Sequence, residues 1–165
     1  MKTKINITSD EKKMTIEMSG EITSESPFPK VMREHDEQKL EIQFKGIDYI
    51  NSGGVRAWIS WTKAMRQAFN GSEMSFDLIP AIMVKQAAQI RGFLPLDSKI
   101  KSFIVSYYCD HCHANLDLVF EKGINLDMSL SQSELIKTIS MAKCDKCGSP
   151  AEIDAVPQDY ICILT

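Results

Sequence analysis

Cys109-Asp110-His111-Cys112 and Cys144-Asp145-Lys146-Cys147 are two copies of one short pattern, and they decide how the last third of this chain is held together. A Cys-x-x-Cys turn lets both thiolates point to one centre, about 2.3 Å from each sulfur when that centre is zinc. Two such turns complete a tetrahedral ligand set. The second turn runs into Gly148, which suits the positive φ that such turns adopt. The sequence therefore predicts a structural zinc site with the ligands Cys109, Cys112, Cys144 and Cys147.

The segment between the two pairs is long for such a site. It has 31 residues, whereas simple four-cysteine ribbons more often have about 15 to 20. Apolar residues alternate over 116–120 and again over 124–128, which predicts an extra hairpin. Ser131 and Glu134 have the capping-box spacing of a short helix, although 138–141 fits a strand equally well.

Other uses of the cysteines and the neighbouring histidines stay open at this point. The pairs also suit thioredoxin-like dithiol chemistry or a disulfide within the chain. His111 and His113 flank Cys112, but four thiolates already fill a tetrahedron, so we expect these histidines to be solvated or to lie next to the ligands. Cys162 lies in an alternating segment, 160–164, which predicts a strand in which Cys162 is a small buried apolar residue.

Length and composition restrict the class of protein. A chain of 165 residues with 44% hydrophobic content can bury one ordinary core and a small satellite. We expect a first domain at 1–106 and a zinc-ribbon domain at 107–165. No stretch approaches the ~20 apolar residues of a membrane span, and the first residues do not resemble a signal peptide. Five cysteines without secretory context indicate a reducing compartment, so we expect a cytoplasmic protein that binds no membrane.

Charge is divided unevenly between the two parts. Residues 109–165 carry four Lys and nine Asp or Glu, a net charge of −5, whereas 1–108 carry fifteen Lys or Arg and thirteen Asp or Glu, a net charge of +2. Nucleic-acid binding depends on Lys and Arg that neutralise phosphates. We therefore expect no direct DNA or RNA binding by the ribbon.

The first hundred residues alternate between strand and helix patterns. We expect strands at 4–8, 14–18, 40–50, 74–78 and 99–108 and helices at 53–69 and 80–92. A short helix is also expected to end near His35 to Glu37. This order predicts the α/β class, with a mixed sheet and helices packed on it, followed by the small β-rich zinc ribbon.

The order of these elements, with the polar turn in Ile50-Asn51-Ser52-Gly53-Gly54-Val55, resembles the STAS domain of anti-sigma-factor antagonists over about residues 1–106. In that family the turn reads Asp-Ser-Ser/Thr-Gly and its third residue is phosphorylated. The corresponding residue here is Gly53, and Asn51 replaces the leading Asp. The resemblance therefore implies the STAS fold without the usual phosphate switch.

Three interpretations of this turn compete. Ser52 is expected to be the N-cap of the helix that follows, with phosphorylation of Ser52 as the alternative. Gly53 and Gly54 suit the approach of an anion to exposed N–H groups at the start of the helix, as in a nucleotide- or anion-binding domain.

The resemblance implies a regulatory or adaptor function. It places a protein partner, a regulatory kinase or a signalling complex, on the exposed face of the helix at 53–69, with Asn51, Ser52, Gly53, Gly54 and Arg56 as the contact residues. The ribbon would recruit a second protein or form a homodimer. No catalytic triad, Walker lysine or dinucleotide fingerprint occurs, so we expect no enzyme activity. A thiol-disulfide or zinc-responsive sensor remains the alternative from another class.

Overall fold

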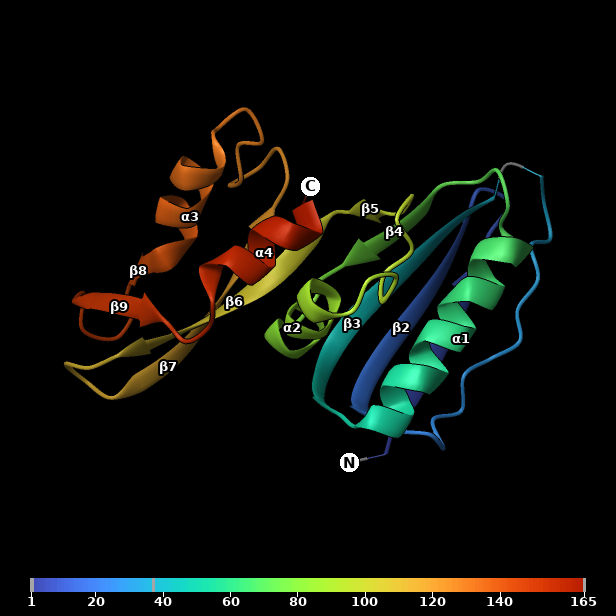
Figure 1. The fold of residues 1–165 in the computed structure, drawn as a ribbon, viewed down its shortest axis with the longest axis horizontal. Helices are drawn as coiled ribbons and strands as arrows, with labels where there is room; N and C mark the ends of the chain where they lie inside the picture. Colours follow the sequence, from blue (N-terminus) through green and yellow to red (C-terminus); the bar gives the residue numbers. More distant parts are fainter. Residues whose placement is uncertain (1, 37, 165) are drawn as a thin grey trace.

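The structure is a computed structural model that describes residues 2–36 and 38–164. It contains two β-sheets with helices packed against them (Figure 1), so the predicted α/β class is confirmed. In chain order the elements are β1 (Lys4–Ser9), β2 (Lys13–Ile22), β3 (Lys39–Ile50), α1 (Ser52–Ala68), β4 (Met74–Asp77), α2 (Ala81–Gln89), β5 (Lys99–Ile100), β6 (Ser102–Cys109), β7 (Ala114–Glu121), α3 (Gln132–Ser140), β8 (Met141–Lys143), β9 (Pro150–Ile153) and α4 (Pro157–Leu164).

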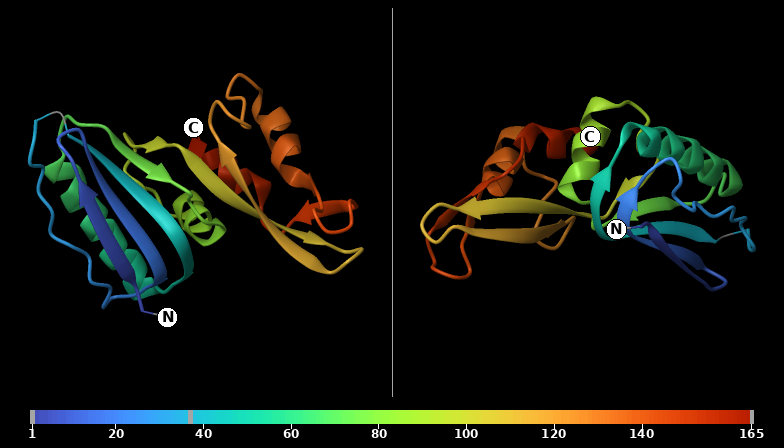
Figure 2. Two further views of the ribbon diagram at one scale, coloured as in Figure 1. Left: turned by 180° about the vertical axis from the view of Figure 1, so that it is seen from behind. Right: turned by 90° about the horizontal axis from the view of Figure 1, so that it is seen from below.

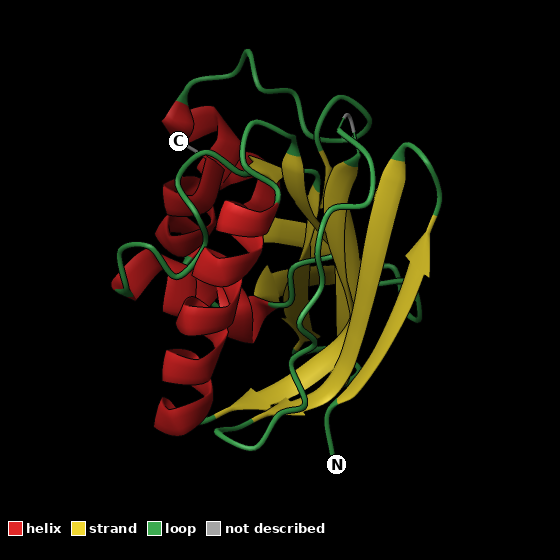
Figure 3. Ribbon diagram, turned by 90° about the vertical axis from the view of Figure 1, so that its right-hand side faces the viewer, coloured by secondary structure: helices red, strands yellow, loops and turns green. Residues whose placement is uncertain are grey.

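The first sheet has the strand order β1-β2-β3-β4-β5 and is mixed. β1 is antiparallel to β2, and the other neighbours are parallel. Figure 3 shows the helices on one side of the strands. Trp58 of α1 is fully buried on that side, with its ring 5.7 Å from Phe44 and 6.2 Å from Phe76. We name this part, residues 4–100, the sheet module.

The opposite face of the first sheet is polar. Successive strands place Thr15, Glu41 and Ser75 side by side in register. The Glu41 side chain is only 3% exposed, and it forms ion pairs with Lys13 at 3.3 Å and with Lys101. A buried carboxylate is tolerated when it is paired in this way.

The second sheet is antiparallel and has the strand order β7-β6-β9-β8. Its core contains an aromatic cluster: Phe103 lies 5.1 Å from Tyr160 of α4 and 5.8 Å from Phe120 of β7, measured between ring centroids. The hydroxyl of Tyr107 donates a hydrogen bond to the carbonyl of Ile139 in α3 at 2.8 Å. We name this part, residues 102–164, the cysteine module.

The two modules are joined through the start of β6, with α2 and α4 in contact beside it (Figure 2). Ile79 forms a parallel bridge with Phe103: its N–H donates to the Ser102 carbonyl at 3.2 Å, and its carbonyl accepts from the Ile104 N–H at 2.8 Å. Leu78 adopts a φ of 56°, and its N–H donates to the Ser102 hydroxyl oxygen at 2.8 Å. β6 therefore begins in contact with the sheet module.

The predicted strand at 99–108 is interrupted. Lys101 separates β5 from β6, and its N–H still donates to the Phe76 carbonyl at 2.8 Å before the chain leaves the first sheet. The other strands and both helices expected in the sheet module form close to the predicted positions.

The short helix expected before His35 does not form in residues 27–36, and its predicted end at Glu37 lies outside the described residues. Pro27 and Pro29 lack the N–H donors of a helix interior. The segment instead runs irregularly beside α1, where Phe28 stacks on Trp61 at 5.0 Å and the Pro29 carbonyl accepts from the Trp61 indole N–H at 2.8 Å.

The prediction for the insertion is wrong at 124–128. β7 forms, but the chain then makes a compact loop instead of a second strand. Asn125 folds back onto β7, donating to the Val119 carbonyl at 2.8 Å and accepting from the Glu121 N–H at 2.7 Å. The helical alternative is correct for 131–140, where Ser131 and Glu134 form the capping box of α3.

The predicted strand at 160–164 is the helix α4. Pro157 is at its first position, which proline favours. Tyr160 and Ile161 face inward, and Cys162 is exposed, so the prediction of a buried Cys162 is wrong. No described helix has the length and hydropathy needed to cross a membrane.

Candidate metal centre

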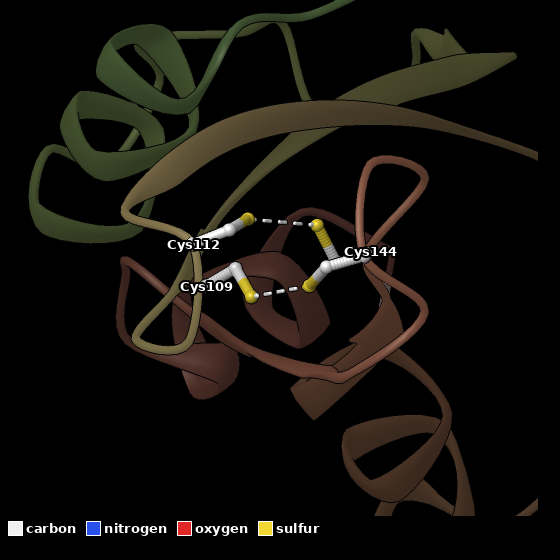
Figure 4. Close-up of side chains that lie close together, drawn as sticks. Cys109, Cys112 and Cys144 are labelled. Carbon is white, nitrogen blue, oxygen red and sulfur yellow. Dashed lines mark hydrogen bonds between the residues drawn. The ribbon is translucent and has the colours of Figure 1, made fainter.

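The side chains of the four cysteines in the two Cys-x-x-Cys pairs lie close together in the structure (Figure 4). Their sulfur atoms all lie within 4.8 Å of one another. The Cys109 and Cys147 sulfurs are 3.5 Å apart, and those of Cys112 and Cys144 are 3.6 Å apart. A tetrahedron with metal–sulfur bonds of about 2.3 Å has edges of about 3.8 Å. The cluster therefore has the dimensions needed to hold a metal ion.

Two hairpin turns bring the sulfurs together. Cys109 ends β6 and Cys112 lies in the turn that leads into β7, while Cys144 and Cys147 lie in the turn between β8 and β9. β6 and β9 pair directly, with Tyr108 opposite Glu152, so the two turns emerge at the same end of the sheet. Sequence positions 32 residues apart thus become neighbours.

The two turns share a conformation that the sequence reveals in only one of them. Gly148 follows its second cysteine and adopts a φ of 74°, as expected. His113 occupies the same place after Cys112 and has a φ of 55° without being glycine. In both turns the next residue donates its N–H to the second cysteine: Ala114 to Cys112, and Ser149 to Cys147. Such hydrogen bonds orient thiolate ligands.

The cluster is covered on one side only. Cys109 and Cys144 are buried, Cys112 is half-buried and Cys147 is exposed. Burial and hydrogen bonds to the other sulfurs raise the pKa of Cys112 to about 12. The N–H and hydroxyl of Ser149 lower the pKa of Cys147 to about 6. Metal binding requires all four as thiolates and would release the protons that the cluster otherwise retains.

The two histidines beside Cys112 stay outside the cluster, as expected. His111 and His113 are both exposed, and the His113 Nδ1 pairs with the Tyr108 hydroxyl at 2.9 Å. Within the described residues, the metal-binding group contains these four cysteines and no histidine or carboxylate. Thiolates favour soft or borderline ions such as zinc or iron. Four of them leave no open coordination position on a tetrahedral ion.

The turn before α1 is built differently from the prediction. Asn51 is the N-cap, and its Oδ1 accepts from the Gly54 N–H at 2.7 Å, so the assignment of Ser52 as N-cap is wrong. Ser52 is the first residue of α1 and is exposed. Gly54 is required for packing, since an added Cβ would lie 2.2 Å from the Ile22 carbonyl oxygen.

The predicted partner-binding residues therefore have different exposure. Ser52 and Arg56 face solvent, whereas Gly54 is buried against β2 and Asn51 is engaged in capping. Ser52 and Arg56 begin an exposed stripe along α1, which continues at further positions three or four residues apart. These positions are Ser60, Lys63 and Gln67. The helical spacing of polar residues was the signal that identifies them.

Comparison of the chain with protein-family models, with curated proteins and with solved structures found no match. The STAS resemblance accordingly rests on the order of elements and on short stretches of sequence, residues 50–55, 77–80 and 90–93.

Proposed function

We propose that this chain is a non-enzymatic adaptor that binds a regulatory protein through its sheet module and uses a zinc ion to hold its cysteine module together. The supporting observation is the four-sulfur cluster, whose dimensions and ligand number fit a closed structural site. Catalytic zinc sites keep a position open for water, and four cysteines remove it.

The partner surface is the exposed stripe of α1, defined by Ser52, Arg56, Ser60, Lys63 and Gln67. α1 contains three basic residues and no acidic one. Arg66 is used within the protein, since its Nε pairs with Asp97 at 2.9 Å. Arg56 and Lys63 are exposed, and the described residues supply no ion pair to either. Charge complementarity therefore favours a partner that presents an acidic surface.

The class of partner follows from the STAS resemblance: a regulatory kinase or a signalling complex. Gly53 occupies the position that is phosphorylated in that family, and glycine has no hydroxyl group to accept a phosphate. Phosphorylation at this position would therefore not release the complex. We propose that binding is constitutive or is controlled at another site, in the cytoplasm and without nucleic acid or membrane. Dimerisation or recruitment of a second protein remains a proposal for the cysteine module.

Metal content tests the first half of this proposal. Protein purified without added metal should contain one zinc per chain by elemental analysis, with the four clustered cysteines resistant to alkylation. A preparation without metal whose pairs are oxidised to disulfides would instead favour the thiol-disulfide sensor.

Affinity capture with matched charge reversals tests the second half. An Arg56→Glu/Lys63→Glu bait should lose a partner that the native bait captures from its source cells. A Lys85→Glu/Lys137→Glu bait, with the same charge change on exposed positions of α2 and α3, should retain that partner. The affinity of the identified partner, measured by calorimetry, should fall about tenfold or more for the α1 variant alone. Equal loss with both baits would contradict the assigned surface.

A further inference from the structure

A cavity of about 380 Å³ lies between the end of α2, the segment that follows it, and α4. Its walls therefore come from both modules, because Cys162 and Ile163 of α4 close one side. This volume lies within the range of small-molecule sites, which occur preferentially where two parts of a protein meet. Neither the zinc site nor the α1 stripe uses this cavity.

The lining is divided between aliphatic and polar residues. Ala88, Leu94, Ile100 and Ile163 contribute carbon surface, and Leu96 at the rim is 80% exposed. An exposed leucine beside this carbon surface offers further apolar area to a ligand that reaches the rim. A short hydrocarbon body fits this lining.

One cation in the lining has no partner among the described residues. Arg91 lines the cavity, and within the described parts of the chain its guanidinium makes neither an ion pair nor a hydrogen bond. Asp97, the acidic residue nearest to it in sequence, is held by Arg66 instead. Guanidinium groups bind carboxylates and phosphates through paired hydrogen bonds.

A second cation lies in the adjoining hollow. That hollow shares Leu96, Ser98, Ile100 and Ile163 with the cavity and is also lined by Lys122. The Lys122 ammonium has no ion pair among residues 2–36 and 38–164. Lys99 borders the same hollow but is paired with Glu73 at 2.5 Å. The local charge thus favours an anion.

We infer that this cavity binds a small amphipathic anion, with its oxyanion head on Arg91 and a short aliphatic body along Ala88, Ile100 and Ile163. Because α4 belongs to the cysteine module and Arg91 to the sheet module, such a ligand contacts both. Occupation of the cavity would therefore stabilise the junction between them by mass action.

Three probe ligands test separately whether binding needs the anionic head and the aliphatic body. Octanoate carries both features, acetate carries only the head, and octylamine carries the same tail with the opposite charge. Calorimetry on the full metal-loaded chain should show saturable binding of octanoate, and neither acetate nor octylamine should bind at the same concentrations. Equal binding of octylamine, or no saturation by octanoate, would overturn the inference.

Variants locate the head and the body. Arg91→Gln should weaken octanoate binding about tenfold or more. Ala88→Leu, which fills the cavity without changing charge, should also abolish binding. Lys85 lies on α2, as Ala88 does, but outside this lining, so the Lys85→Gln variant should bind octanoate as the native chain does. Retention of affinity in both the Arg91 and Ala88 variants would exclude this cavity.

Cys162 supplies an independent readout, because it is exposed and lines the cavity. Octanoate should slow the alkylation of Cys162 by iodoacetamide, whereas acetate should leave the rate unchanged. Peptide mass spectrometry measures this rate. An unchanged rate at saturating octanoate would place the ligand elsewhere.

Discussion

The two modules stabilise their interiors in different ways. The sheet module buries Trp58 of α1 among Phe44, Phe76 and Phe93. The cysteine module has its own buried core, with Phe103 between Phe120 and Tyr160, and places a four-sulfur cluster at the far end of its sheet. Small units are only marginally stabilised by hydrophobic burial, and a metal ion held by the four sulfurs would add to their stability. The sheet module thus depends on hydrophobic burial, whereas the cysteine module combines burial with a cluster positioned to hold a metal ion.

Removal of a metal ligand should separate the two halves most sharply. Cys144→Ser removes a buried sulfur of the cluster and should cost the cysteine module a large part of the metal-binding free energy, which is on the order of 10 kcal/mol in small zinc modules. Hydrogen exchange should show loss of protection in β6 to β9 and retention in β2 and β3. Cys162→Ser, at the exposed cysteine, should change neither metal content nor exchange.

The sheet module can be weakened in turn, with the metal in place. Gly54→Ala should lower its free energy of unfolding by about 3 kcal/mol, because the new Cβ meets the Ile22 backbone. Gly53→Ala meets only the Ser24 and Asn51 side chains, at 3.1 Å or more, and should stay within about 1 kcal/mol of the native chain. Tryptophan fluorescence monitors this module selectively, since both tryptophans lie on α1. Equal effects of the two substitutions would disprove the close approach.

The start of α1 gives a smaller effect that distinguishes its two polar residues. Asn51→Ala removes the N-cap and should cost about 1 kcal/mol in urea unfolding. Ser52→Ala should cost little, because the Ser52 side chain is exposed and caps nothing. A larger cost for Ser52→Ala than for Asn51→Ala would restore the original assignment.

The pH dependence of the sheet module should depend in part on Glu41. Burial would raise the pKa of Glu41, but the hydrogen bonds and charges of Lys101 and Lys13 outweigh burial and hold it below its ordinary value of 4.5. A lowered carboxyl pKa stabilises the folded state above the unfolded pKa, and this contribution is lost as the pH falls through the folded pKa. Urea midpoints followed by tryptophan fluorescence should therefore fall below about pH 4.5. In Glu41→Gln this acid slope should be shallower, and an unchanged slope would assign it to other groups.

Local patterns predicted the sheet module well because its signals lie within single elements. Alternation in β2 and β3 and the helical period of α1 each depend on neighbouring residues. The clustering of the four cysteines was predictable because cysteine spacing encodes chemistry directly. The exact first residue of α1 was not predictable from the sequence. Asn51 rather than Ser52 caps the helix, and the Asn51 N–H is held by the carbonyl of Ile22 at the end of β2, a contact between residues far apart in the sequence.

The cysteine module was harder to predict because tertiary contacts select between local alternatives. Residues 160–164 alternate like a strand, yet Tyr160 packs on Phe103 only as part of a helix. The loop after β7 is held by Asn125, whose backbone contacts leave no pattern in the sequence. The positive φ of His113 is imposed by its turn and cannot be inferred from the residue type.

The continuity of β6 also bears on how this protein can be recombined with others. Its first residues are hydrogen-bonded to Ile79, and its last residue is Cys109 of the four-sulfur cluster, about 24 Å away along an extended strand. A recombination breakpoint within β6 would give each of the two recombinant proteins only part of a strand that both modules use. A transplant of the cysteine module into another protein would therefore have to carry residues 77–80 with it, or replace the backbone hydrogen bonds that Ile79 gives to β6.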